Sequence, residues 1–123
     1  MPLHDDVRDS GLTIIDTLVD EVHICSSDPG VTTYGNLASA TLGKKAAAAG
    51  SLVGSPAPHT PTGRKVTTAA IADGEVTADG TASHFALVDT ANSRVLATAA
   101  LNGDQVVTDG NPFTLTSQYV AIP

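Results

Sequence analysis

His23 and Cys25 are the residues whose types and spacing come closest to a reactive site. They lie two positions apart in a short apolar run, so on a strand both side chains would point to the same face. Together with Asp28 and either His59 or His84 they could offer nitrogen, sulfur and oxygen ligands to zinc. Structural zinc sites usually repeat a closely spaced Cys or His pair, and this chain has one such pair. We therefore expect no metal ion, and a buried role for His23 and Cys25.

Nucleophilic and acid–base chemistry have little support in the sequence. Cys25 would need a nearby base to form a thiolate, and the sequence identifies no His–carboxylate partner for it. His84 lies within an expected strand and has no evident carboxylate neighbour, so a hydrogen-bonded structural role is expected rather than that of a general base. An enzyme site assembles several polar groups in an enclosed pocket, and no such set is recognisable. We expect a non-enzymatic protein without a cofactor.

Acidic residues at expected turns invite a calcium interpretation: Asp73, Asp79, Asp104 and Asp109. They lack the dense alternating pattern of a calcium loop, and an Asp at a turn usually bonds to the backbone first. The stretch Gly50–Gly54 is not followed by the Lys-Ser/Thr of a phosphate loop. Neither ligand is expected.

The charge balance disfavours nucleic acid as a partner. The chain has 6 basic and 13 acidic residues and a formal charge of −7. Its basic neighbours, Lys44–Lys45 and Arg64–Lys65, are pairs, whereas nucleic-acid affinity comes from clusters of Lys and Arg. No apolar run reaches the length of a membrane span. The N-terminus lacks the residue order of a secretory signal, so we expect synthesis in a cytoplasm and no membrane partner.

Residues 1–22 are predicted to form an N-terminal helix or arm. Apolar and small residues follow the spacing of one helix face: Val7, Gly11, Ile14, Ile15, Leu18 and Val22. Asp5 and Asp6 are N-cap candidates. The helix could pack on its own domain or dock against a neighbouring subunit. In the second case Val7, Leu12 and Ile15 would be interface residues.

Residues 23–123 are predicted to form the second unit, a β domain of seven or eight short strands. Seven strands are expected after Arg64, at 65–71, 75–77, 81–88, 94–101, 105–108, 113–116 and 118–122. The apolar run 22–26 and the segment 41–46 are further candidates. Asp73-Gly74, Asp79-Gly80 and Asn102-Gly103 are predicted turns, because Gly adopts positive φ without steric cost. The connections are too short for crossover helices, so pairing should be antiparallel. The predicted fold is mainly β: an antiparallel β-sandwich, jelly-roll or immunoglobulin-like, with an N-terminal α-helix.

The segment 50–63 is rich in Pro and Gly and is predicted to be an extended surface loop or arm. Extended Pro-rich segments lose little entropy on a partner surface. A solvated linker and an arm onto another subunit both remain open. For the arm, the candidate interface residues are Pro56, Pro58, His59 and Pro61.

Two stretches carry a resemblance: HICSSDPGVTTYGNLASATLGKKAAAAG at 23–50, and 63–122 with its GRKVT and GTASH motifs. In these stretches the chain resembles a group of small tailed-bacteriophage proteins, mostly described only as hypothetical or virion structural proteins. The resemblance covers almost the whole chain. It implies a structural place on a phage particle and carries no catalytic residues.

The expected function is therefore that of a non-enzymatic virion structural protein. A homo-oligomeric capsid decoration or cement protein on the outer shell is preferred over a neck or tail-fibre attachment protein. Its partners would be the major capsid protein or head–tail and fibre components, and its location the virion. An acidic surface favours a place away from packaged DNA. The alternative from another class is a carbohydrate- or receptor-binding module, for which the chain offers only four aromatic residues: Tyr34, Phe85, Phe113 and Tyr119.

Overall fold

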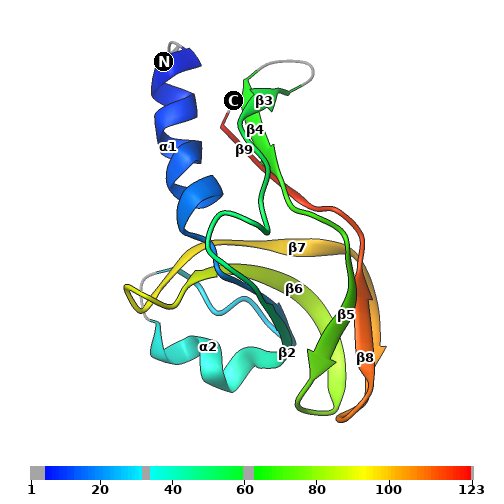
Figure 1. Ribbon diagram of the computed structural model, residues 1–123. Coiled ribbons are helices and arrows are strands. Elements are labelled where there is room, and N and C mark those ends of the chain that lie inside the picture. The colour runs from blue at the N-terminus through cyan, green and yellow to red at the C-terminus, as the bar shows by residue number, and fades with distance from the viewer. Residues whose placement is uncertain (1–4, 32–33, 60–62, 123) are drawn as a thin grey trace.

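The computed structural model describes residues 5–31, 34–59 and 63–122 (Figure 1). The chain starts with helix α1 (Asp5–Leu18), strand β1 (Glu21–Cys25), the short helix α2 (Gly35–Ala40) and strand β2 (Thr41–Ala46). Seven further strands follow: β3 (Ala57–Pro58), β4 (Arg64–Thr67), β5 (Ile71–Val76), β6 (Gly80–Asp89), β7 (Arg94–Val107), β8 (Pro112–Leu115) and β9 (Tyr119–Ile122). The prediction of a mainly β chain with an N-terminal α-helix is confirmed.

The strands form two sheets. The larger has six strands in the order β7-β6-β1-β2-β5-β8, and the smaller has three in the order β3-β4-β9. Every pairing between these named strands is antiparallel, as the short connections predict. The six-and-three division is this chain's own arrangement and differs from the four-and-three division of a constant-type immunoglobulin domain.

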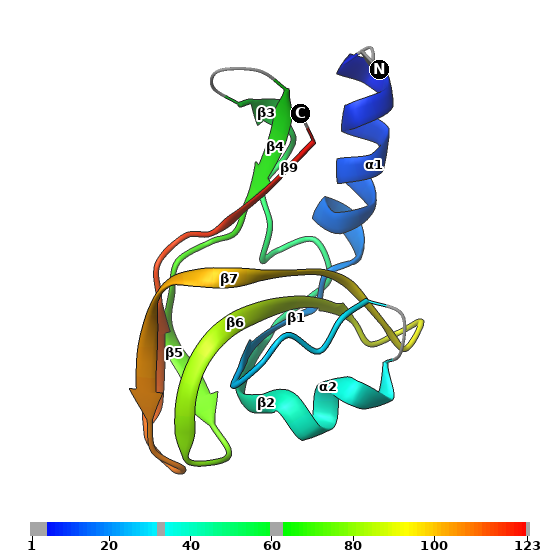
Figure 2. The same ribbon diagram turned by 180° about the vertical axis from the view of Figure 1, so that it is seen from behind.

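Helix α1 stands beside the three-stranded sheet, and both project from one side of the six-stranded sheet (Figures 1 and 2). The helix packs mainly on β4 and β9. Leu12 and Ile15, together with Val19 just after the helix, are buried in the main core. The helix ends at Leu18, earlier than predicted, because Glu21 and Val22 belong to β1, where they pair with β2 and β6.

Two nearly continuous strands connect the sheets. The β4–β5 segment runs beside the β8–β9 segment, so that β4 pairs with β9 and β5 with β8. The predicted strand 65–71 is broken between the two sheets, where Thr68 and Gln118 replace the regular ladder. The Thr68 N–H donates to Gln118 O at 2.7 Å, and the Gln118 N–H donates to Thr68 Oγ1 at 2.8 Å. These buried bonds satisfy the backbone at the corner where the chain leaves one sheet for the other.

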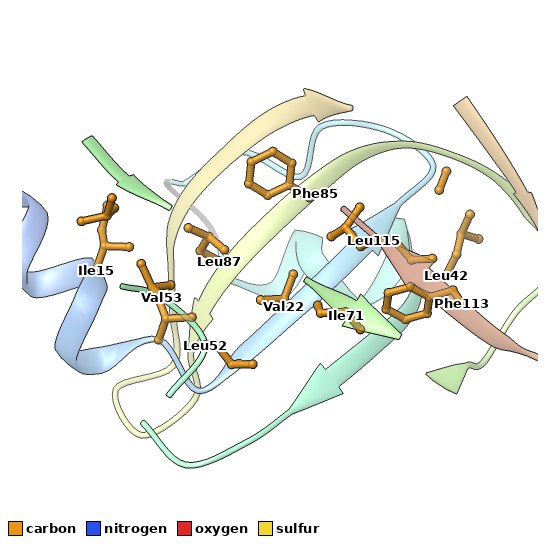
Figure 3. Packing of buried hydrophobic residues seen from close by; sticks show 14 of the residues in the cluster. Ile15, Val22, Leu42, Leu52, Val53, Ile71, Phe85, Leu87, Phe113 and Leu115 are labelled. Carbon is orange, nitrogen blue, oxygen red and sulfur yellow. The ribbon is translucent and has the colours of Figure 1, made fainter. Parts of the chain in front are cut away.

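The main core lies between the large sheet, α1 and the small sheet, and Figure 3 shows its side chains. Phe113 of β8 is buried against Gly74 of β5. A Cβ at Gly74 would lie 2.2 Å from two carbons of the Phe113 ring. The prediction of a turn at Asp73-Gly74 is therefore wrong: both residues lie inside β5, and the glycine leaves room for a ring rather than making a corner.

Asn102-Gly103 is a second predicted turn that lies inside a strand. β7 runs unbroken through it, while the pairing with β6 shifts between Ala82↔Gln105 and His84↔Ala100. The interval between these two pairs spans three residues on β6, 82–84, and six residues on β7, 100–105. Extra residues of this kind form a bulge that bends a strand. Figure 1 shows β7 turning sharply along its length.

Helix α2 was not predicted. It covers the other face of β1 and β6, where a second cluster of buried residues gathers: Cys25, Leu37, Ala40, Ala86, Val88 and Val95. On this face the central strands are therefore covered by the chain itself. The six-residue helix begins with Gly35 and Asn36, which are weak helix formers, so propensity gives little sign of it.

Candidate functional site

A pocket of about 420 Å³ opens between β1, β2 and α2. Its polar wall comes from the two paired strands, with Glu21 and His23 on β1 and Thr41 and Lys44 on β2. Its other walls come from the start of α2 and from two further loops: Tyr34, Gly35, Leu37, Ala38, Thr77 and Thr90. The antiparallel pairing, which sets His23 opposite Lys44, brings these groups together.

His23 is held on both ring nitrogens. Its Nε2 lies 2.7 Å from Glu21 Oε1, and its Nδ1 lies 2.9 Å from Thr41 Oγ1. A carboxylate only accepts hydrogen bonds, so Nε2 carries the proton and donates it to Glu21. In the neutral ring Nδ1 then accepts from the Thr41 hydroxyl. The result is a chain of hydrogen bonds from Thr41, the first residue of β2, through the imidazole to Glu21.

Thr41 has a second neighbour. Its hydroxyl also lies 2.8 Å from the Leu37 carbonyl oxygen, which already accepts the Thr41 backbone N–H at the C-cap of α2. A hydroxyl has one proton and can donate to one of the two acceptors. In the protonated imidazole, Nδ1–H would donate to Thr41 Oγ1 and the hydroxyl would turn to Leu37. Either protonation state of His23 therefore finds a complete set of partners.

Burial lowers the pKa of His23 below its ordinary value, although the hydrogen bond to Glu21 opposes the effect. The imidazole is therefore neutral at neutral pH. The Lys44 ammonium lies 3.7 Å from Glu21 Oε2, an ion pair slightly longer than a hydrogen bond. Glu21 is thus placed by an imidazole on one oxygen and a cation near the other.

Cys25 lies on the same strand face as His23, as its spacing predicts, and it packs against Leu37 and Ala40 of α2. The residue is fully buried. Burial raises the pKa of the Cys25 thiol to about 11, so it stays protonated at neutral pH and is a poor nucleophile. This supports the buried structural role that the sequence indicates.

The structure does not bring together the residues that were considered as zinc ligands. His59 follows β3 at the small sheet and its ring lies against Tyr119 of β9, whereas His23 lies on β1 of the large sheet. Within residues 5–31, 34–59 and 63–122, no group of three or more His, Cys, Asp or Glu side chains is placed to hold a metal ion. Two of the four aspartates that were considered as calcium ligands contact the protein itself. Asp73 pairs with Lys45 at 3.0 Å, and Asp79 Oδ1 accepts the Asp109 backbone N–H at 2.7 Å.

His84 has a carboxylate in its surroundings that the sequence did not reveal. Asp28 is close enough for the His84 charge to help lower its pKa, although the main causes are hydrogen bonds from the Gly30 N–H at 2.9 Å and from Thr98 Oγ1 at 2.8 Å. The His84 Nδ1 lies 2.8 Å from Ser83 Oγ, whose hydroxyl lies 3.0 Å from the Ser26 carbonyl oxygen. These bonds tie the loop after β1 to β6 and β7, which is a structural role.

A second surface feature, which we call the Tyr119 surface, comprises His59, Lys65 and Tyr119 on the small sheet. The Tyr119 residue is 54% exposed. Its ring lies 5.1 Å from the His59 ring, and Lys65 Nζ lies 5.4 Å from its centroid, within the range of a cation–π contact. A hollow of about 330 Å³ adjoins it, lined by Phe85, Ala99, Ala100, Ser117, Gln118 and Tyr119.

The predicted interface residues divide between the core, this surface and unplaced positions. Leu12 and Ile15 are buried in the chain's own core. The helix was predicted either to pack on its own domain or to dock against a neighbouring subunit. These two side chains do the first, and neither is accessible to a partner. The side chain of Val7 lies outside the described residues, as does Pro61.

The Pro-rich segment folds back on its own chain where it is described. Pro58 pairs with Arg64 as part of the edge strand β3, and Val53 forms a bridge with Thr68. Leu52 is buried in the main core, and Pro56 is half-buried. Residues 50–59 therefore add a strand to the small sheet instead of extending as a free arm, and His59 joins the Tyr119 surface. An edge is where Pro is tolerated in a sheet, because its missing N–H faces away from the ladder.

No protein-family model, curated protein or solved structure matches the chain. Neither described helix has the length and apolar character needed to cross a membrane.

Proposed function

We propose that this protein is a non-enzymatic structural component of a tailed-bacteriophage virion, a capsid decoration or cement protein that binds the outer shell as a homo-oligomer. The alternative proposal is that the protein attaches at the neck of the particle or to a tail fibre. The resemblance of residues 23–50 and 63–122 to small phage virion proteins supports this proposal. The acidic charge of −7 favours a site away from packaged DNA.

The Tyr119 surface is the observation that carries the proposal. Protein interfaces are enriched in tyrosine. The side chains that contribute most to binding lie in well-packed pockets from which water is excluded when the partner binds. Tyr119 is exposed, lies on a sheet rather than on a mobile loop, and borders a hollow. Lys65 gives this part of an acidic chain a local positive charge, so we expect an acidic contact region on the partner.

In the proposed mechanism the two parts of the fold have different tasks. The six-stranded sheet holds the core, and α1 supports the small sheet from behind. The small sheet presents the Tyr119 surface to the shell. Symmetry then multiplies a modest contact over many copies.

The test uses phage particles assembled with and without this chain. Decoration predicts that the purified particle contains the protein at a stoichiometry set by capsid symmetry, and that particles lacking it release DNA at a lower temperature. Particles complemented with Tyr119→Ser should lose the protein, whereas those carrying Tyr34→Ser should retain it. An unchanged particle composition after deletion of the chain would overturn the proposal.

A further inference from the structure

The pocket between β1, β2 and α2 has no part in the proposed virion contact, which places the partner on the small sheet. We propose that this pocket binds a neutral polyhydroxylated ligand of the size of a monosaccharide, such as the terminal sugar of a glycan. The inference does not rest on the virion proposal, since it uses different residues and a different sheet.

The size of the pocket and its walls suit such a ligand. Small-molecule sites occupy about 300–1,000 Å³, and this pocket of about 420 Å³ lies toward the lower end. Tyr34 stands in its wall and is 37% exposed. An aromatic ring next to polar groups offers a flat apolar surface to the C–H groups of a sugar, while its hydroxyl can remain wet.

The polar groups offer both acceptors and donors. Each carboxylate oxygen has two lone pairs, and the hydrogen bond from His23 to Glu21 Oε1 uses one of them. The Lys44 ammonium has three N–H donors and lies 3.7 Å from Glu21 Oε2 without a hydrogen bond between them. Adjacent hydroxyls of a sugar can donate to the carboxylate and accept from the ammonium. A neighbouring acceptor and donor of this kind fit a pair of hydroxyls.

The charge of the pocket favours a neutral ligand. Three titratable groups face it from the strands, Glu21 and His23 from β1 and Lys44 from β2, and Tyr34 faces it from the α2 side. Glu21 and Lys44 form an ion pair, so their charges cancel locally. An anion would have to compete with Glu21 for Lys44, and a cation would have to compete with Lys44 for Glu21.

The acceptor is fixed in place before any ligand arrives. β1 lies between β2 and β6, so the Glu21 backbone is paired on both sides, with Ala46 and with Val88. Its side chain is 17% exposed and is held by the His23 ring, which Thr41 fixes in turn. Groups held in this way lose little entropy on binding.

The proposal is tested by titrating the full chain with D-glucose, D-galactose, D-mannose and N-acetylglucosamine, following the His23 ring signals by NMR. We expect a saturable shift with at least one sugar and a Kd on the order of 1 mM. Tyr34→Ala should weaken that binding about 10-fold. Tyr34→Leu, which keeps an apolar side chain, tests the same contact if the alanine variant misfolds.

Two matched controls separate the pocket from general surface effects. Tyr119→Ala removes the chain's other tyrosine, and Lys45→Met removes the lysine next to Lys44 that pairs with Asp73 instead. Both should leave the Kd unchanged, whereas Lys44→Met should raise it. Three results would overturn the proposal: no saturation with any of the four sugars, equal affinity of the Tyr34 variants and the parent protein, or saturation by inorganic phosphate alone.

Discussion

The two sheets of this protein are covered in different ways. The six-stranded sheet packs against the main core on one face, and on the other face α2 covers its central strands β1 and β6. The three-stranded sheet has α1 behind it and leaves Tyr119 exposed on the other side. Stability should therefore depend mainly on the large sheet, and the small sheet can present aromatic and basic side chains without weakening the core.

The largest expected effect comes from Phe113→Ala on the large sheet. Phe113 is 1% exposed and is one of the two phenylalanines in the chain. Its removal should lower the free energy of unfolding by about 3–5 kcal/mol, because a cavity remains where the ring packed. Urea titration of both proteins measures the change. Thr114→Ala, an exposed neighbour on β8, serves as the control, and equal losses for the two variants would contradict a core built around this ring.

Gly74→Ala tests the same contact from the opposite strand. The added methyl would meet the Phe113 ring, so we expect a loss of about 1–3 kcal/mol from overpacking. Gly103→Ala is the matched control, since a Cβ there meets nothing within 4 Å. If the alanine at position 74 proved neutral or stabilising in urea titrations, Asp73-Gly74 would be closer to the turn that the sequence suggests.

Gly74 shows how much of the fold the sequence can predict. Strand propensity predicts most of the strands, and alternation places Phe85 and Leu87 on one face of β6, as observed. An Asp-Gly pair looks the same whether the glycine turns the chain or admits a ring from a strand distant in sequence. The difference at Gly74 depends on Phe113, and no local pattern contains that information.

The candidate pocket was less predictable than the fold. The spacing of His23 and Cys25 correctly places both on one strand face. The sequence does not show that Glu21, Thr41 and Lys44 would converge on His23, because that depends on the register of β1 against β2. The only local sign of α2 is the spacing of its buried residues, Leu37 and Ala40.

A smaller effect is expected from the protonation of His23. The folded state holds the pKa of His23 below the ordinary value of about 6.5, so below that pH the unfolded chain binds the proton more readily. Stability should be unaffected by this group at higher pH. It should fall as the pH drops from about 6.5 toward the folded pKa, with a slope of at most about 1.4 kcal/mol per pH unit.

His23→Gln should flatten this part of the profile. Free energies of unfolding measured by urea titration between about pH 5 and pH 8 provide the comparison with the parent protein. His84→Gln is the control for a histidine that is less buried. A parent profile that rises as the pH falls through this window would mean that the Glu21 contact outweighs burial.

The smallest effect on stability should come from the small sheet. Tyr119→Ser removes an exposed ring and should change the free energy of unfolding by less than about 1 kcal/mol. If that substitution instead destabilised the protein as much as Phe113→Ala, the ring would be part of the packing, and the distinction between the two sheets would fail.

The most direct measurement compares the chemical modification of the two tyrosines in the free protein and in purified particles. The chain contains only Tyr34 and Tyr119, at 37% and 54% exposure in the free protein, so each serves as the reference for the other. We predict that nitration of Tyr119 is suppressed in the particle while that of Tyr34 continues at the rate seen in the free chain. Equal modification of Tyr119 in both states, or protection confined to Tyr34, would contradict contact through the small sheet.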